Sequence, residues 1–227
     1  MEYRLRWSLP VNEMIFHMRT KTFLTTIIVL AMPLIAVAQS NTWETNENLA
    51  EQGTNTVTSP DAKYLEGAVP EVNGKVVFSA TLAAPGKSAR EIYDLLLAEM
   101  QRQAVEPGQF EQSRLSFADP DGLQLAGSYM EWLVFRSSAL VLDRSRLMYH
   151  IVVSCRDGQA DVLMQNIRYL YDEERQPEAI KAEEWITDKY GLNKKKDKLA
   201  RVSGKFRRKT IDRKDYLFKR YETVLNQ

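Results

Sequence analysis

Residues 75–83 read K-V-V-F-S-A-T-L-A, and this run decides how the rest of the sequence is interpreted. The apolar residues at every second position share one face of an extended chain: Val76, Phe78, Ala80 and Leu82. Alternation of this kind predicts a β-strand with one buried and one exposed face.

A helix is predicted directly after this strand and the Pro85-Gly86 turn that ends it. Ser88 and Glu91 have the spacing of a capping box, in which the two residues satisfy each other's backbone donors at a helix start. The residues that follow place apolar side chains on one helical stripe: Ile92, Leu95, Leu96 and Met100. Pro107 and Gly108 predict the end of this helix.

Three further strands are predicted next. Residues 112–118 and the run from Leu123 through Phe135 are joined by D-P-D-G at 119–122, a strong hairpin signal because proline presets one dihedral and glycine tolerates positive φ. Residues 147–155 (L-M-Y-H-I-V-V-S-C) are the most hydrophobic run and predict a central strand. No element is assigned to residues 137–146.

A second helix is expected over residues 160–171, with Leu163, Ile167 and Leu170 as its buried stripe. The predicted order is therefore strand, helix, three strands, helix. This order indicates an α+β domain in which helices pack on one face of an antiparallel sheet.

Three short motifs stand out: Tyr64–Phe78 (YLEGAVPEVNGKVVF), Ser88–Asp94 (SAREIYD) and Glu183–Lys189 (EEWITDK). They resemble an uncharacterised family of secreted bacterial proteins, described as a domain of unknown function with a TBP-like fold. The resemblance covers roughly residues 63–227 and implies a β-α-β-β-β-α unit. It implies no activity and no DNA binding, because a shared topology does not carry function.

The first 38 residues are expected to be a leader and signal peptide. From Met18 the chain has a short basic start, an apolar core and a small-x-small site ending at Ala38, after which we predict cleavage. No cysteine stands at the cleavage point, so a lipid anchor is not expected, and the apolar core is too short to span a bilayer. The protein is therefore expected to be periplasmic or secreted, without a transmembrane anchor after cleavage. Met1, Met14 and Met18 all remain possible starts.

The mature chain is expected to have three parts. Residues 39–62 form a flexible polar leader with Trp43 as its one large apolar side chain, 63–176 form the TBP-like domain, and 177–227 form a basic helical extension. Within the extension we expect a short helix over 178–190, closed by Gly191. A last helix is expected to be capped by Asp212, with an apolar stripe formed by Leu217, Tyr221 and Val224 or Leu225.

Charge is divided unevenly between these parts. Residues 39–176 carry 12 Lys and Arg against 20 Asp and Glu, whereas residues 177–227 carry 15 against 8. The candidate contacts for an anion or a partner are Lys194, Lys195, Lys196, Lys198, Arg201, Lys205, Arg207, Arg208 and Lys209. Of three interpretations, the leading one is that these cations dock on the chain's own acidic part or serve solubility. The next is an envelope protein or an anionic envelope surface, and nucleic acid is disfavoured because export removes the protein from cytoplasmic DNA and RNA.

The sequence offers little to catalysis. Cys155 and His150 are five apart on one predicted strand, so they face opposite sides of the sheet, and no G-x-S-x-G motif is present. The carboxylate pairs at 119/121 and 173/174 are explained by a turn and a charged helix end. No catalytic, cofactor or metal residues are assigned.

We therefore expect a non-catalytic binding or interaction module at the cell envelope. The alternatives are a carrier of a small hydrophobic ligand held between sheet and helices and, with least support, an enzyme. The identity of a ligand or partner and the oligomeric state stay open.

Overall fold

The computed structural model describes residues 41, 43, 61–138, 141–171 and 178–227. The strands are β1 (Glu71–Val72), β2 (Lys75–Val76), β3 (Phe78–Ala83), β4 (Arg114–Asp119), β5 (Gln124–Ser138), β6 (Val141–Arg156), β7 (Gln159–Tyr171) and β8 (Glu178–Lys181). The helices are α2 (Ala89–Ala104), α3 (Asp188–Gly191) and α4 (Ser203–Leu225), with 3₁₀ turns η1 (Ala62–Tyr64) and η2 (Ala182–Glu184).

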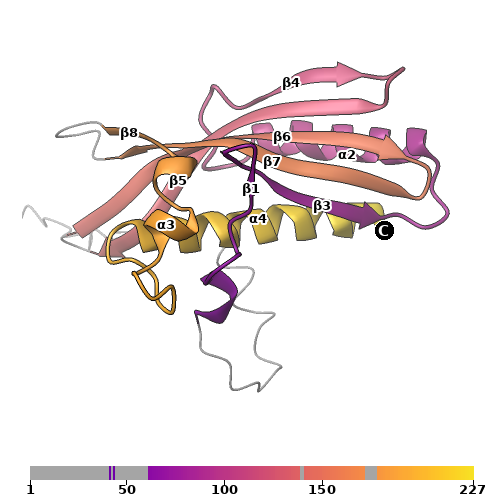
Figure 1. The fold of residues 1–227 in the computed structure, drawn as a ribbon. Coiled ribbons are helices and arrows are strands. Elements are labelled where there is room, and N and C mark those ends of the chain that lie inside the picture. Colours follow the sequence, from indigo (N-terminus) through magenta and orange to yellow (C-terminus); the bar gives the residue numbers. More distant parts are fainter. Residues whose placement is uncertain (1–40, 42, 44–60, 139–140, 172–177) are drawn as a thin grey trace, which may run out of the picture. The chain divides into compact units, whose positions relative to one another are not determined.

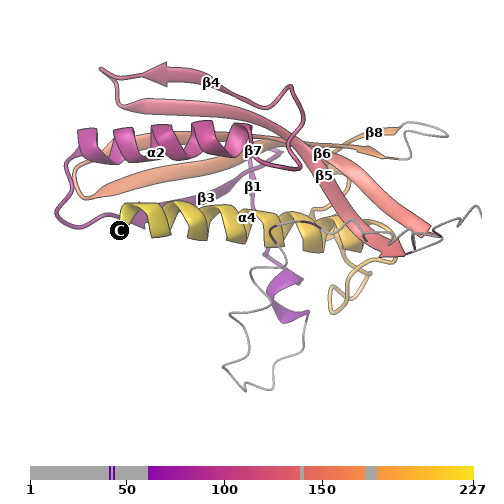
Figure 2. The ribbon, with the colours of Figure 1, turned by 180° about the vertical axis from the view of Figure 1, so that it is seen from behind.

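Six strands form one antiparallel sheet in the order β3-β7-β6-β5-β4, with β8 also pairing with β7 (Figure 1). Short turns join β4 to β5 and β6 to β7, so the long strands β5, β6 and β7 form a meander at the centre of the sheet. Helices α2 and α4 lie side by side on one face of this sheet (Figure 2). This arrangement confirms the α+β class and the antiparallel sheet with helices on one face.

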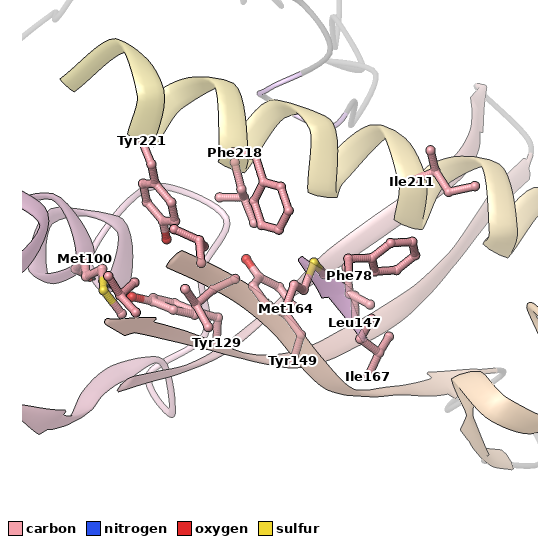
Figure 3. Packing of buried hydrophobic residues seen from close by; sticks show 14 of the residues in the cluster. Phe78, Met100, Tyr129, Leu147, Tyr149, Met164, Ile167, Ile211, Phe218 and Tyr221 are labelled. Atoms are coloured by element: carbon pink, nitrogen blue, oxygen red, sulfur yellow. Dashed lines mark hydrogen bonds between the residues drawn. The ribbon is translucent and has the colours of Figure 1, made fainter. Parts of the chain in front are cut away.

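The core lies between the sheet and the two helices. From residue 145 to 155 the odd-numbered residues of β6 are buried, among them Leu147, Tyr149, Ile151, Val153 and Cys155. Helix α4 contributes Ile211, Phe218 and Tyr221, which point toward the sheet in Figure 3. Burying apolar area on this scale is the main favourable contribution to folding.

The first predicted elements are confirmed. Val76, Phe78 and Leu82 are buried on one face of β2 and β3, and both hydrogen bonds of the Ser88–Glu91 capping box are present at the start of α2. The hairpin turn between β4 and β5 is also present, and the Asp119 carboxylate accepts from the backbone N–H groups of the turn.

The helix expected over residues 160–171 is wrong, because this segment is strand β7. The two residues Asp157 and Gly158, with φ of +76° at the glycine, make the tight turn of a hairpin with β6. A bulge at Asn166 then shifts the alternation by one residue, so that Ile167 is buried three positions after Met164. The stripe expected from Leu163, Ile167 and Leu170 is not one buried face, because Ile167 is buried whereas Leu163 and Leu170 are only half-buried.

The boundaries expected in the C-terminal part are also wrong. Residues 178–190 are not one helix but β8, η2 and the single turn α3. Helix α4 begins at Ser203, nine residues before the expected cap, and Asp212 lies inside the helix, where its carboxylate accepts a hydrogen bond from Tyr64 Oη at 2.7 Å. Lys and Arg are good helix formers, and their charges near the start of α4 are matched by acidic neighbours.

Two residues of the expected flexible leader are held by the domain. The Asn41 side chain donates to the Val134 carbonyl at 3.0 Å and accepts from its N–H at 2.8 Å. Trp43 is 3% exposed, and its ring lies 6.2 Å from that of Tyr216 on α4. The predicted signal peptide, its cleavage point and residues 44–60 lie outside the described residues.

Candidate functional site

The nine cations singled out in the C-terminal segment divide into two groups. Lys194, Lys195, Lys196, Lys198 and Arg201 are exposed on the loop between α3 and α4. Lys196 pairs with Glu66 at 2.5 Å. The remaining four cations are half-buried or buried on α4: Lys205, Arg207, Arg208 and Lys209.

Arg207 is fully buried and holds three parts of the chain together. Its guanidinium donates to the Tyr64 and Leu65 carbonyls at 2.6 Å, to the Ile186 carbonyl at 2.8 Å and to the Asp188 carboxylate at 2.7 Å. Gly191 lies against this side chain, and a Cβ there would come within 2.8 Å of Arg207 Cδ. Arg207 is therefore occupied by the protein itself.

Lys205 and Arg208 also have partners within the fold. Lys205 Nζ pairs with Asp143 at 2.6 Å and lies 4.5 Å from the ring centroid of Phe135 and 4.7 Å from that of Tyr171. Arg208 pairs with Asp61 at 2.5 Å. For these residues the contacts favour docking onto the chain's own acidic part over an outside partner.

A second buried polar network connects α2, the sheet and α4. The Glu131 carboxylate accepts from Tyr149 Oη at 2.7 Å and from Arg213 Nε at 2.8 Å, and Gln103 bridges Tyr149 to Tyr221. Burial disfavours the charge of Arg213, but the Glu131 carboxylate outweighs this and raises its pKa. Because these donors and acceptors have partners and are closed to solvent, the network fixes helices on the sheet and does not form a reactive site.

The face of the sheet opposite the helices carries the groups that remain accessible. Two adjacent hollows lie on it, with volumes of about 220 and 250 Å³. The first is lined by polar, charged and apolar side chains: Gln112, Arg114, Ser128, Tyr129, Met130, Met148, Tyr149, His150, Asn166 and Arg168. The second is lined by Lys75, Val77, Gln165, Asn166, Ile167, Arg168, Lys181 and Glu183. Asn166 and Arg168 belong to both.

The bulge in β7 creates the second hollow. The pairing of β3 with β7 ends at Met164, and that of β8 with β7 begins at Arg168. Residues 165–167 therefore have no paired strand on the outer edge of β7. Asn166 has φ of +54° here, a left-handed conformation that asparagine tolerates better than most residues.

The hollows are electropositive. Four cations line them (Lys75, Arg114, Arg168 and Lys181), whereas Glu183 is their only acidic lining residue. Within the described part of the chain, no ion pair involves Lys75, Arg114 or Arg168. This is the opposite of α4, where Lys205, Arg207 and Arg208 each pair with a carboxylate.

His150 lies at the centre of this face. Its ring is half-buried, and Asn166 Nδ2 lies 3.3 Å from His150 Nε2. Burial, and secondarily the charge of Arg168, lowers the pKa of His150. The imidazole is therefore neutral at pH 7 and offers hydrogen bonds without adding charge.

The sheet separates His150 from the thiol, as predicted. Cys155 is buried on the helix-covered face, and burial raises the pKa of its thiol to about 11, which keeps it protonated and unreactive. No group of three His, Cys, Asp or Glu side chains in the described ranges is arranged to hold a metal.

Comparison with known proteins places the chain in a family. Residues 78–170 match DUF4468, described as a domain of unknown function with a TBP-like fold. A crystal structure of a DUF4468 family protein from Bacteroides ovatus is 44% identical, with a TM-score of 0.69 over 75% of this chain and 97% of that chain. The chain belongs to the DUF4468 family.

A more distant similarity supports the same DUF4468 fold. A TBP-like protein from Parabacteroides distasonis is 18% identical, with a TM-score of 0.56 over 69% of this chain and 96% of that chain. A search of curated proteins found no match. The predicted family and the TBP-like fold are thus confirmed.

The open-face cations of this DUF4468 protein were missed by sequence reasoning. They lie far apart along the chain, and Arg168 fell in the segment expected to be a helix. The sequence does contain a signal for Arg168. This arginine stands between the buried residues Ile167 and Tyr169, so in a strand its side chain lies on the opposite, exposed face of β7. Reading that segment as a bulged strand places these side chains on the exposed face.

Proposed function

We propose that this protein is a non-catalytic binding module of the bacterial cell envelope, periplasmic or secreted, that binds an acidic protein partner on the open face of its sheet. The observation that carries the proposal is the contrast between two sets of cations. Those of α4 are neutralised inside the fold, whereas Lys75, Arg114 and Arg168 face solvent around two hollows without an acidic partner among the described residues. Exposed cations of this kind attract and orient an oppositely charged surface.

The shape of the face favours a protein over a membrane. Hollows of about 220 and 250 Å³ are large enough to admit individual side chains of a protein partner. In the described part of the chain, no helix has the length and hydrophobicity needed to cross a membrane.

The carrier alternative has less support. A hydrophobic ligand between sheet and helices needs space, and that layer is filled by side chains of little or no exposure, including Leu96, Met100, Leu125, Ile151 and Tyr221. Nucleic acid is disfavoured by the proposed export. Export rests on the signal pattern from Met18 to Ala38, and it predicts a mature protein in the periplasm or medium whose first residue is Gln39. An intact N-terminus on a cytoplasmic protein would contradict it.

Binding to a labelled oligoglutamate peptide, followed by fluorescence anisotropy, tests the proposed surface. The double variant Arg114→Glu/Arg168→Glu reverses two charges on the open face, and Lys194→Glu/Lys195→Glu reverses two exposed charges on the α3–α4 loop. We expect the face variant to lose about tenfold or more in affinity, because each charge contact contributes up to about 1 kcal/mol and reversal adds repulsion.

The loop variant is the matched control and should change affinity by less than about twofold. Loss of binding in the loop variant alone would move the binding surface to that loop. Equal binding by all three proteins would contradict a role for the open face. Tighter association with phosphatidylglycerol vesicles than with the peptide would show that the partner is a membrane and not a protein.

A further inference from the structure

We propose that the hollow beside the β7 bulge is a binding site for one carboxylate group, supplied by an acidic side chain of the partner. The inference rests on the proposed function and assigns a ligand to one part of the open face. The site lies where no strand is paired with the outer edge of β7, between the end of β3 pairing at Met164 and the start of β8 pairing at Arg168.

Three cations from three different elements converge on this hollow. Lys75 comes from β2, Arg168 from β7 and Lys181 from β8, and all three are exposed. Lys181 has only a loose contact with Glu184, at 3.7 Å between side chains that are both more than half exposed. Arg168 has a planar fork of donors suited to a carboxylate, and Lys75 and Lys181 add point charges on either side.

Two amide side chains add uncharged donors to the same hollow. Gln165 and Asn166 both line it, and they belong to the three residues of β7 that are not paired with a strand on that edge. Backbone held at positive φ in a non-glycine residue costs free energy, and such conformations concentrate where a ligand is held. The bulge thus places two amides and Arg168 around one opening.

Glu183 reduces the positive charge of this site. Its carboxylate lines the hollow and is fixed there by accepting the Val76 N–H at 3.1 Å. With three cations and one carboxylate the lining has a net charge of +2, so it attracts an anion, and Glu183 makes that attraction weaker than three cations alone would. The volume of about 250 Å³ also suits a side chain better than a larger ligand.

The test is an NMR titration of the mature chain, residues 39–227, with sodium acetate against sodium chloride at equal ionic strength. We expect acetate alone to produce saturable shifts of the Gln165 and Asn166 side-chain amides. The Lys75→Gln/Lys181→Gln variant should weaken acetate binding about fivefold or more, and Lys194→Gln/Lys195→Gln should leave it unchanged. Asn166→Gly, which keeps the positive φ but removes the amide, should also weaken it.

Several results would overturn the carboxylate site. Identical shifts with chloride would show that the hollow has no site, and inorganic phosphate binding more tightly than acetate would replace the carboxylate by a phosphate. Saturable binding unaffected by Lys75→Gln/Lys181→Gln would place the site elsewhere. If acetate does not bind but oligoglutamate binding still depends on Arg114 and Arg168, the carboxylate site is ruled out and the proposed function stands. If oligoglutamate also fails to bind, the proposed function falls with it.

Discussion

Replacing Arg207 by alanine should destabilise the fold more than the loss of any other cation of the basic segment. The side chain is fully buried, and its guanidinium donates to four acceptors: the carbonyls of Tyr64, Leu65 and Ile186, and the carboxylate of Asp188. Alanine would leave these acceptors without their donor and would open a cavity beside Gly191. Breaking a buried charged pair by removing one partner costs about 3–5 kcal/mol.

Urea unfolding followed by circular dichroism measures this cost. With a slope of about 2 kcal/mol per molar urea, the predicted loss lowers the unfolding midpoint by about 1.5–2.5 M. Total stabilities are about 5–15 kcal/mol, so the loss in Arg207→Ala is large enough to unfold a marginally stable protein. Arg207→Lys is therefore a milder second variant. It keeps the charge but cannot reach every acceptor, and it should lose about half as much free energy of unfolding.

Lys195→Ala is the matched control, since it removes an exposed cation of the same segment and should change stability by less than about 0.5 kcal/mol. A loss below about 1 kcal/mol in Arg207→Ala would refute the reasoning that this cation is part of the structure. Unfolding in the control would refute the division of the segment into internal and exposed cations.

Four further outcomes follow from the structure. Asp119→Ala removes the acceptor for two backbone N–H groups of the β4–β5 turn and should cost about 1 kcal/mol in urea unfolding. Gly191→Ala should cost about 1–3 kcal/mol in the same assay, because its Cβ would lie 2.7 Å from the Ile186 carbonyl. Cys155, with a pKa raised to about 11, should react with a thiol reagent at pH 8 only after unfolding, and fast reaction of the native protein would show that it is accessible. The lowered pKa of His150 means that the unfolded chain binds more protons, so stability should fall as the pH drops below about 6.5, and His150→Gln should reduce this dependence.

Local patterns in the sequence predicted the elements whose signals are contained in a few adjacent residues. The alternation at 75–83, the Ser88–Glu91 capping box and the D-P-D-G turn each act through neighbouring atoms, and each is present in the structure. That Cys155 and His150 lie on opposite faces of the sheet was predictable for the same reason, because successive side chains in a strand alternate between the two faces.

Features that depend on distant contacts could not be predicted. The apolar residues Leu163, Ile167 and Leu170 have helical spacing, and only the pairing with β6 shows that their segment is a bulged strand. Lys205 near the start of α4 pairs with Asp143, which is far away in the sequence. Composition showed that residues 177–227 are basic, but only the fold shows which cations are neutralised. The open-face site was hidden because Lys75, Arg114 and Arg168 become neighbours only in the folded sheet.

Chemical-shift mapping of the isotope-labelled mature chain with unlabelled oligoglutamate tests binding on the open face without a mutation, because it locates the bound peptide. We expect saturable, salt-sensitive shifts at residues of the open face, centred on Asn166 and Arg168, with residues 194–201 unaffected. Shifts confined to residues 194–201, or no saturable shifts anywhere, would contradict this expectation.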